Sequence, residues 1–202
     1  MASRRPCPGR PMTADTVADL TADPTSAVRL LGAVFRHGQC AGRIVETEFY
    51  DQTDPASHTF GGPTPRNQPM FEAAGHLYVY RSYGIHWCAN IVVGEPGWGS
   101  AVLVRALAPL EGIDLMWSRR PRAKKATDLC SGPGKLCAAL DVDRTDTGQY
   151  LIDGGRISLE LAEPPEPDAV LVGRRVGITK AVDRPWRFSF DDPNVSKPRP
   201  RR

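Results

Sequence analysis

Two glutamates and a tyrosine recur at alternate positions in the segment 43–50, which is rich in β-branched and aromatic residues and is therefore predicted to be a strand. Because strand side chains alternate between two faces, Glu46, Glu48 and Tyr50 point the same way. Successive same-face positions are roughly 7 Å apart, which suits one carboxylate activating a water at a sugar carbon. The residues alone leave a second interpretation open, in which the strand faces solvent and the glutamates are ordinary surface charges.

Aromatic residues are concentrated in the segment 76–93, which is predicted to be a β-hairpin. Tyr78, Tyr80, Tyr83 and Trp87 fall within ten residues of one another. Aromatic faces stack on unpaired bases, and a side chain at a loop tip can wedge into a duplex where a nucleotide has been flipped out. Tyr83 is placed for that wedge, whereas core packing is the alternative for Trp87 and Tyr78.

The elements that must position these side chains follow from the same kinds of pattern. Further strands are expected at 101–107, 157–161, 170–178 and 186–190, and helices at 23–31, 110–116 and 133–140. Strands that bunch together with irregular intervening helices are typical of an α+β fold with a mostly antiparallel sheet. The 202 residues fit one domain, placed at 23–191 between a disordered tail at 1–22 and a basic, Pro-rich tail at 192–202.

Composition limits the classes of protein to consider. Hydrophobic residues make up 41% and charged residues 24%, and no apolar run approaches the ~20 residues of a membrane helix. The first residues do not resemble a secretory signal, so we expect a cytoplasmic, nucleoid-associated protein. Five scattered cysteines indicate reduced thiols, and their spacing does not fit zinc; we expect neither metal nor cofactor. Basic residues at 119–125 and in the tail could contact phosphates or be solvated.

A set of ordered fragments carries a family resemblance. In chain order they are Gly42–Tyr50 (GRIVETEFY), His58 with Gly61-Gly62, Thr64–Asn67 (TPRN), Met70-Phe71, Leu77–Tyr80 (LYVY) with Tyr83-Gly84, Asn90, Leu103–Leu107 (LVRAL), Pro109–Gly112 (PLEG) and Cys130–Pro133 (CSGP). Together they resemble the methylpurine (3-methyladenine, alkyladenine) DNA glycosylase family over about residues 25–190. The resemblance implies a curved sheet surrounded by helices, with a protruding hairpin that enters DNA.

The resemblance also implies which residues act on the sugar. Glu48 matches the catalytic glutamate that orients and deprotonates the attacking water, and Arg105 and the backbone carbonyl of Val176 match its other water contacts. A carboxylate stabilises the oxocarbenium-like state as well as activating water. We expect Arg105 to keep Glu48 ionised and to bond to it directly or through the water. Glu46, on the same predicted face, could in principle exchange roles with Glu48.

A second group of matching residues would bind the base. Tyr50, His58 and Tyr80 match the pocket that sandwiches a flipped base, and Asn90 matches the asparagine that disfavours the amino group of guanine. Tyr83 matches the tyrosine that intercalates into the duplex. For Tyr80 and Asn90 to share a face, the hairpin loop must contain an odd number of residues, so we predict a three-residue turn in which Tyr80 pairs with Cys88.

The predicted activity is that of a monofunctional DNA glycosylase acting as a monomer on double-stranded DNA with damaged purines. No lysine precedes Lys124, so water, rather than an amine, should attack the sugar. The lesion range stays open between 3-methyladenine, 7-methylguanine, hypoxanthine and ethenoadenine.

Two other activities remain as alternatives. One is a non-catalytic DNA-binding module that uses the aromatic hairpin and the basic clusters, and the other is a carbohydrate glycosidase. A phosphate-binding P-loop at 131–135 fails, because Leu129 occupies the position of its first glycine.

Overall fold

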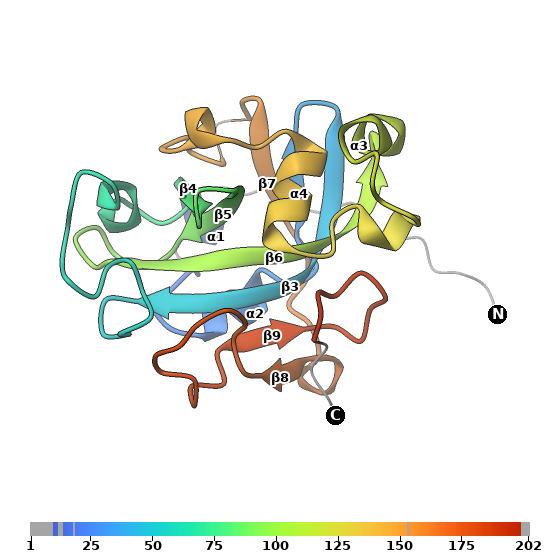
Figure 1. Cartoon of the computed structure of the whole chain (residues 1–202). Coiled ribbons are helices and arrows are strands. Elements are labelled where there is room, and N and C mark those ends of the chain that lie inside the picture. Colours follow the sequence, from blue (N-terminus) through green and yellow to red (C-terminus); the bar gives the residue numbers. More distant parts are fainter. Residues whose placement is uncertain (1–9, 12–13, 18, 153, 199–202) are drawn as a thin grey trace.

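The computed structural model describes residues 10–11, 14–17, 19–152 and 154–198, and antiparallel strands dominate them (Figure 1). The strands are β1 Arg10–Pro11, β2 Val34–His37, β3 Cys40–Asp51, β4 Leu77–Ser82, β5 His86–Val92, β6 Ser100–Glu111, β7 Ile157–Leu161, β8 Leu171–Gly173 and β9 Arg187–Ser189. The helices are α1 Ala14–Val17, α2 Thr25–Arg29, α3 Ile113–Arg119 and α4 Pro133–Leu140, with 3₁₀ turns at Gln68–Phe71, Ala126–Asp128, Arg144–Asp146 and Pro167–Ala169.

Strand β3 is the centre of the sheet because it is paired along both edges. One edge pairs with β6, and the other pairs first with β2 and then, at Glu46–Glu48, with β9. The order along the sheet is β1-β7-β2-β3-β6-β5-β4, and β8 adds to β9. The sheet curls into a half-barrel, with β8 and β9 on the opposite side of β3 from β6 (Figure 1). The predicted α+β class with an antiparallel sheet is confirmed.

Both faces of β3 are buried, which explains its composition. Apolar Ile44 and Phe49 belong to the main core, while Val45 packs in a smaller cluster on the other face. Glu46 and Glu48 are also fully buried. The interpretation of this segment as a solvent-facing strand is therefore wrong, and each buried carboxylate must have its own partners.

The pairing of β3 with β6 is interrupted by two bulges close to the glutamates. Ile44 pairs with Leu107, Glu46 with Ala106 and Thr47 with Val104, so one residue is left over first on β3 and then on β6. The extra residue on β6 is Arg105. A bulge redirects the side chain of the residue that it leaves unpaired, and Arg105 is thereby brought to the glutamates.

The hairpin of β4 and β5 has the predicted register. Tyr80 pairs with Cys88 and Ser82 with His86, which leaves a three-residue loop, 83–85. Tyr83 and Gly84 both have a positive φ, 49° and 69°, and the N–H of Ile85 donates to the carbonyl of Ser82. The predicted three-residue turn is confirmed.

The helices are fewer and shorter than the resemblance implied, and they do not surround the sheet. In Figure 1, α4 crosses one face of the sheet beside β5 and β6, with α3 at its end. The predicted helix at 110–116 is wrong at its start, because β6 continues to Glu111 and the helix begins only after Gly112, whose φ is 68°. The predicted strand 170–178 contracts to β8.

Described residues on either side of the predicted domain, 23–191, also pack against it. On the N-terminal side, β1 pairs with β7, and Val17 and Leu20 pack in the main core. On the C-terminal side, Val195 and Ser196 are 4% exposed. These few apolar side chains form no periodic pattern in the sequence, yet they are sufficient to hold both segments against the domain. Residues 1–9 and 199–202 lie outside the described part, so the predicted tails stay predictions for these residues.

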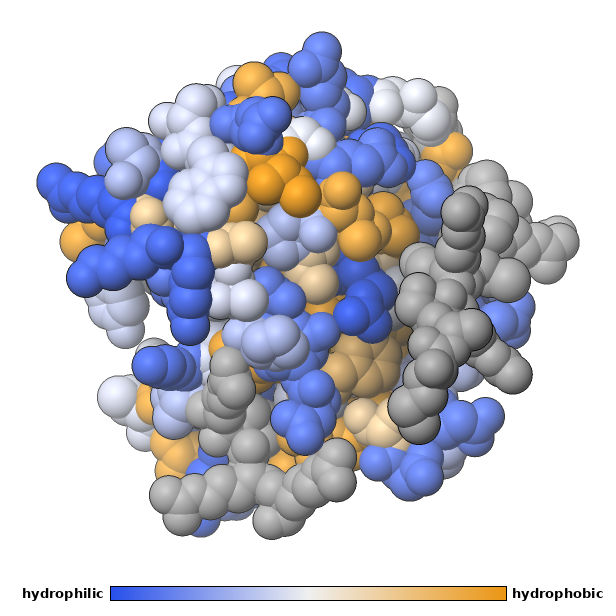
Figure 2. Space-filling model, turned by 90° about the vertical axis from the view of Figure 1, so that its right-hand side faces the viewer, coloured by the Kyte–Doolittle hydropathy of each residue, from blue (hydrophilic) through white to orange (hydrophobic). Residues whose placement is uncertain are grey.

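One face of the molecule is mainly hydrophilic, and the described cysteines are free and buried. On the coloured part of the face in Figure 2, hydrophilic residues surround small groups of apolar ones. Four free cysteines are buried, and Cys7 lies outside the described residues. Within the described part, no helix has the length and apolarity to cross a membrane, and no cluster of three His, Cys, Asp or Glu side chains could hold a metal ion.

Candidate active site

A cavity of about 360 Å³ opens between the β4–β5 hairpin, the end of β3 and the loop that follows β8. Its volume is in the range of small-molecule sites. Seven of the eight residues expected to act on sugar, base or duplex line it, and the eighth, Glu48, contacts its lining directly. The lining comprises Tyr50, Ala56, Ser57, His58, Arg66, Met70, Tyr78, Tyr80, Arg81, Ser82, Tyr83, Cys88, Asn90, Leu103, Arg105, Pro133, Val176, Gly177 and Ile178.

Glu48 lies immediately beneath this cavity and is bonded to three of its lining residues. The Tyr50 hydroxyl donates to Glu48 Oε2 at 2.8 Å, and the Val176 N–H donates to Oε1 at 2.7 Å. Arg105 Nη1 is 3.2 Å from Oε1. The family resemblance implies a role for the carbonyl of Val176; the bond in the structure is instead made by its N–H, and the carbonyl role stays a prediction.

The charge on Glu48 is set by opposing effects. Burial raises the pKa of Glu48 and dominates, while Arg105, the Val176 N–H and the Tyr50 hydroxyl lower it, so the pKa lies above its ordinary value. Burial, and then the charge of Glu48, also raise the pKa of Tyr50 well above its ordinary value, so this hydroxyl remains a donor. A carboxylate with a raised pKa in a cleft is suited to accept a proton.

Glu46 occupies different surroundings, although it shares Arg105 with Glu48. Its carboxylate accepts from Arg105, from Arg187 and from Ser196, and Glu46 does not line the cavity. With its oxygens already bonded to these donors, it has no contact with the space where a base could sit. The geometry therefore distinguishes the two glutamates that the sequence left interchangeable.

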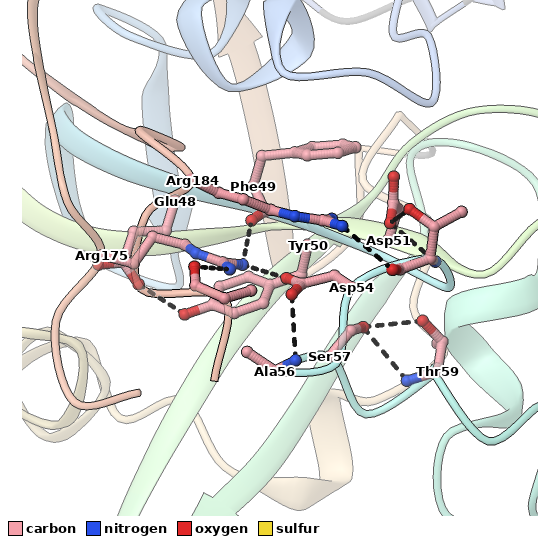
Figure 3. Close-up of polar contacts among 12 residues, drawn as sticks. Glu48, Phe49, Tyr50, Asp51, Asp54, Ala56, Ser57, Thr59, Arg175 and Arg184 are labelled. Atoms are coloured by element: carbon pink, nitrogen blue, oxygen red, sulfur yellow. Dashed lines mark hydrogen bonds and ion pairs between the residues drawn. The ribbon is translucent and has the colours of Figure 1, made fainter. Parts of the chain in front are cut away.

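Tyr50 forms one wall of the cavity and is supported from behind by a buried arginine (Figure 3). The guanidinium of Arg175 lies 4.5 Å from the centre of the Tyr50 ring. It pairs with the fully buried carboxylate of Asp54 and donates to the carbonyl of Phe49 at 3.1 Å. Because Arg175 directly precedes Val176, the same anchor holds both the ring and the N–H that contact Glu48.

His58 and two tyrosines form an aromatic group on the hairpin side of the cavity. The His58 and Tyr80 rings are 4.4 Å apart and nearly perpendicular, and Tyr78 and Tyr80 are stacked at 5.7 Å. His58 Nδ1 is 3.1 Å from the Tyr78 hydroxyl. Burial, helped by the charge of Arg66, lowers the pKa of His58, which favours a neutral ring. Such faces can stack on a flat, uncharged or cationic ring.

Asn90 shares the face of Tyr80 and lines the cavity, as the three-residue turn requires. Its side-chain NH₂ donates to the carbonyls of Tyr78, at 3.1 Å, and Cys88. These bonds fix the orientation of the amide.

Tyr83 stands at the mouth of the cavity, at the tip of the hairpin. It is 87% exposed, and the adjacent Ile85 is 67% exposed. Together the two side chains form an exposed apolar tip, and exposed apolar patches mark interaction sites, so the tip is suited to insert into another molecule.

The site contains several residues that were not predicted from the sequence. Arg66 and Met70 line the cavity, and their fragments (TPRN and MF) could have pointed to them. Arg81 also lines it. The Asp54–Arg175 pair and the contacts of Ser196 left no sequence signal, because their partners are distant along the chain.

The chain is similar to known proteins over most of its length. Residues 19–194 match a family model described as methylpurine-DNA glycosylase. A protein of Agrobacterium fabrum is 54% identical over 165 residues, which cover 80% of each chain. One of Nitrosospira multiformis is 46% identical over 89% of this chain and 92% of its own, and one of Methanoculleus marisnigri is 49% identical over 81% and 88%. All three carry the name "Putative 3-methyladenine DNA glycosylase".

Proposed function

The chain belongs to the methylpurine-DNA glycosylase family, and from this premise we propose that it removes damaged purines from duplex DNA by hydrolysing the N-glycosidic bond of a flipped nucleotide. Membership makes it an enzyme of the DNA-3-methyladenine glycosylase type, with DNA repair as its role. The observation that carries the proposal is the buried Glu48 carboxylate beneath an aromatic cavity wide enough for a base.

In the first step, the hairpin tip enters the duplex and the damaged nucleotide leaves the stack. Tyr83 would fill the space that the nucleotide vacates, which its exposure at the cavity mouth supports. A damaged or mispaired nucleotide loses less pairing and stacking energy when it is extruded. Selection therefore begins before the base reaches the cavity.

In the second step, the base is held between aromatic side chains. Tyr50, His58 and Tyr80 all line the cavity, and the His58 and Tyr80 rings are in contact; we expect the base to lie between Tyr50 and this pair. The fixed amide of Asn90 would disfavour the additional amino group of guanine, because a rigid wall cannot move to accommodate it.

In the third step, Glu48 activates a water at the sugar. As the purine leaves, positive charge develops on the sugar, and a nearby carboxylate stabilises it while accepting the proton of the water. Arg105 would hold both the carboxylate and the water. In the structure the Tyr50 hydroxyl covers Glu48 Oε2, so the water must enter between them or beside Oε1.

Water is the proposed nucleophile because no amine is within the site. No lysine is found among the described residues that line the cavity. The product is then an abasic site in an uncut strand, as expected of a monofunctional enzyme acting as a single chain.

The direct test is release of base from oligonucleotides that each carry one lesion, namely 3-methyladenine, 7-methylguanine, hypoxanthine or ethenoadenine. Glu48→Gln should slow release about 10²–10⁴-fold, the usual contribution of a general base. Glu111→Gln, which neutralises an exposed carboxylate, is the matched control and should keep the wild-type rate. Equal rates for the two variants would refute the role of Glu48.

The alternative of a DNA-binding module is supported by the exposed Tyr83 alone. It predicts binding to damaged duplex without release of any base at any protein concentration. The four-lesion assay on the wild-type chain therefore separates the two functions, and it also decides whether deaminated purines are substrates.

A further inference from the structure

The guanidinium of Arg105 is held from below by residues that do not reach the cavity. Its Nε donates to Glu46 Oε1 at 3.0 Å, and its Nη2 donates to the Ser196 hydroxyl at 3.1 Å. Only Nη1 is directed to Glu48. The planar guanidinium is thus fixed at two of its three nitrogens, and the third is presented to the proposed base.

Glu46 and Ser196 are in turn bound to each other and to β9. Ser196 donates twice to Glu46, through its N–H at 2.7 Å and its hydroxyl at 2.9 Å. Arg187 donates through Nε to Glu46 at 2.6 Å and through Nη2 to the Ser196 carbonyl at 3.1 Å. We call the three residues Glu46, Arg187 and Ser196 the Arg105 clamp. All three are at most 4% exposed.

The clamp also completes the charge balance beneath the cavity. Glu46 and Glu48 contribute two carboxylates, and Arg105 and Arg187 contribute two guanidiniums. A buried charge without a partner is costly, whereas a fully bonded network is tolerated. Removing either Glu46 or the contacts of Ser196 would leave Arg105 free to turn from Glu48 towards another acceptor.

We propose that Glu46 and Ser196 are positioning residues for Arg105, so that the C-terminal segment around Ser196 takes part in catalysis without touching the substrate. This rests on the proposed function, in which Arg105 holds Glu48 and its water. The long arginine side chain loses rotamer freedom when it is fixed. Because the clamp fixes Arg105 during folding, this entropy is already lost before the substrate binds. A group placed in advance accelerates the chemical step rather than substrate binding.

A serine pair provides the first test. Ser196→Ala removes the hydroxyl that contacts both Glu46 and Arg105, and Ser189→Ala removes a nearby buried hydroxyl that has no hydrogen-bond partner among the described residues. In single-turnover assays we expect Ser196→Ala to lower the rate of base release about 10-fold or more, the order lost with one bond to a charged group. Affinity for damaged DNA should change less than about 2-fold, and Ser189→Ala should match the wild type in both. Equal rates for the two variants would overturn the proposal.

The second test is independent of turnover and uses the contact between Glu46 and Arg105. The groups that face Glu48 are Tyr50 and Glu46 on β3, Arg105 on β6 and the Val176 N–H after β8; the charge of Arg105 lowers the pKa of Glu48 more than the charge of Glu46 raises it. If Glu46 positions Arg105, Glu46→Gln releases the guanidinium from Glu48, so the titration of Glu48, followed by carboxyl ¹³C NMR, should move to higher pH, whereas Glu46→Asp should keep it close to the wild type. A shift to lower pH, which loss of the Glu46 charge alone would give, or an unmoved titration would overturn the proposal.

The two tests separate the inference from the function on which it rests. A wild-type chain that releases no base from any lesion would refute the proposed function, and the titration would still decide whether the clamp acts on Glu48. A wild-type chain that releases base, with Ser196→Ala as fast as Ser189→Ala, would refute the clamp alone.

Discussion

Loss of the Asp54 carboxylate should destabilise the protein far more than loss of a surface carboxylate, because it leaves Arg175 as a buried cation. Both side chains are 0% exposed, and they form a direct ion pair. Deleting one partner of such a pair costs about 3–5 kcal/mol. For a chain of this size, where about 1 kcal/mol shifts Tm by roughly 2–4 °C, Asp54→Ala should lower Tm by about 6–20 °C.

The matched control is Glu111→Ala. Glu111 also pairs with an arginine, Arg36, at 2.6 Å, but the side chains are 56% and 30% exposed. Exposed pairs contribute about 0–1 kcal/mol, so this variant should stay within about 4 °C of the wild-type Tm. Both variants remove a carboxylate bonded to a guanidinium, so a difference in their Tm values reports the effect of burying the ion pair.

Urea unfolding followed by tryptophan fluorescence and circular dichroism would measure both free energies of unfolding. The slope with urea must be unchanged for the comparison to hold. The double variant Asp54→Ala/Arg175→Met should lose less than the sum of its single variants, because the uncompensated cation is gone as well. The reasoning is refuted if Asp54→Ala loses no more stability than Glu111→Ala.

Three further outcomes are expected. Because burial raises the pKa of Glu48 and only its ionised form can accept a proton, the single-turnover rate should fall on acidification at a pH above the ordinary glutamate range; a limb at or below that range contradicts it. A Cβ at Gly134 would lie 2.7 Å from His86 Cβ, so Gly134→Ala should push α4 from the hairpin and slow base release about 10-fold, unlike Gly155→Ala, whose Cβ meets nothing. Borohydride should trap no covalent DNA complex, and a trapped one would show that an amine attacks.

Elements defined by local pattern could be predicted from the sequence. The alternation along β3 and the aromatic hairpin are short-range features, and both elements are present. The end of β6 was misplaced because apolar residues around Leu110 satisfy strand and helix patterns alike; the left-handed Gly112 ends the strand. β8 was also predicted too long: it ends at Gly173, and the following Arg175 and Val176 instead contact Asp54 and Glu48, which are distant in the sequence.

The parts that could not be predicted depend on contacts between distant segments. Arg105 reaches the glutamates because of a bulge in β6, which follows from pairing with β3 and not from its own sequence. Ser196 lies 150 positions from Glu46, and its docking contradicts the appearance of a Pro-rich tail. Buried ion pairs carry no periodicity, so only the folded chain shows which charges meet.

The three-residue turn at 83–85 makes the hairpin tolerant of substitutions in the loop but sensitive to changes in the loop's length. Substitutions there alter the tip alone, but removal or addition of a single residue would rotate Asn90 to the back of the ribbon and break up the pocket wall. Length changes in steps of two would preserve that wall while altering how far the tip extends. A variant lengthened or shortened by two residues would thus change the reach of the hairpin and still keep the same chamber for the base.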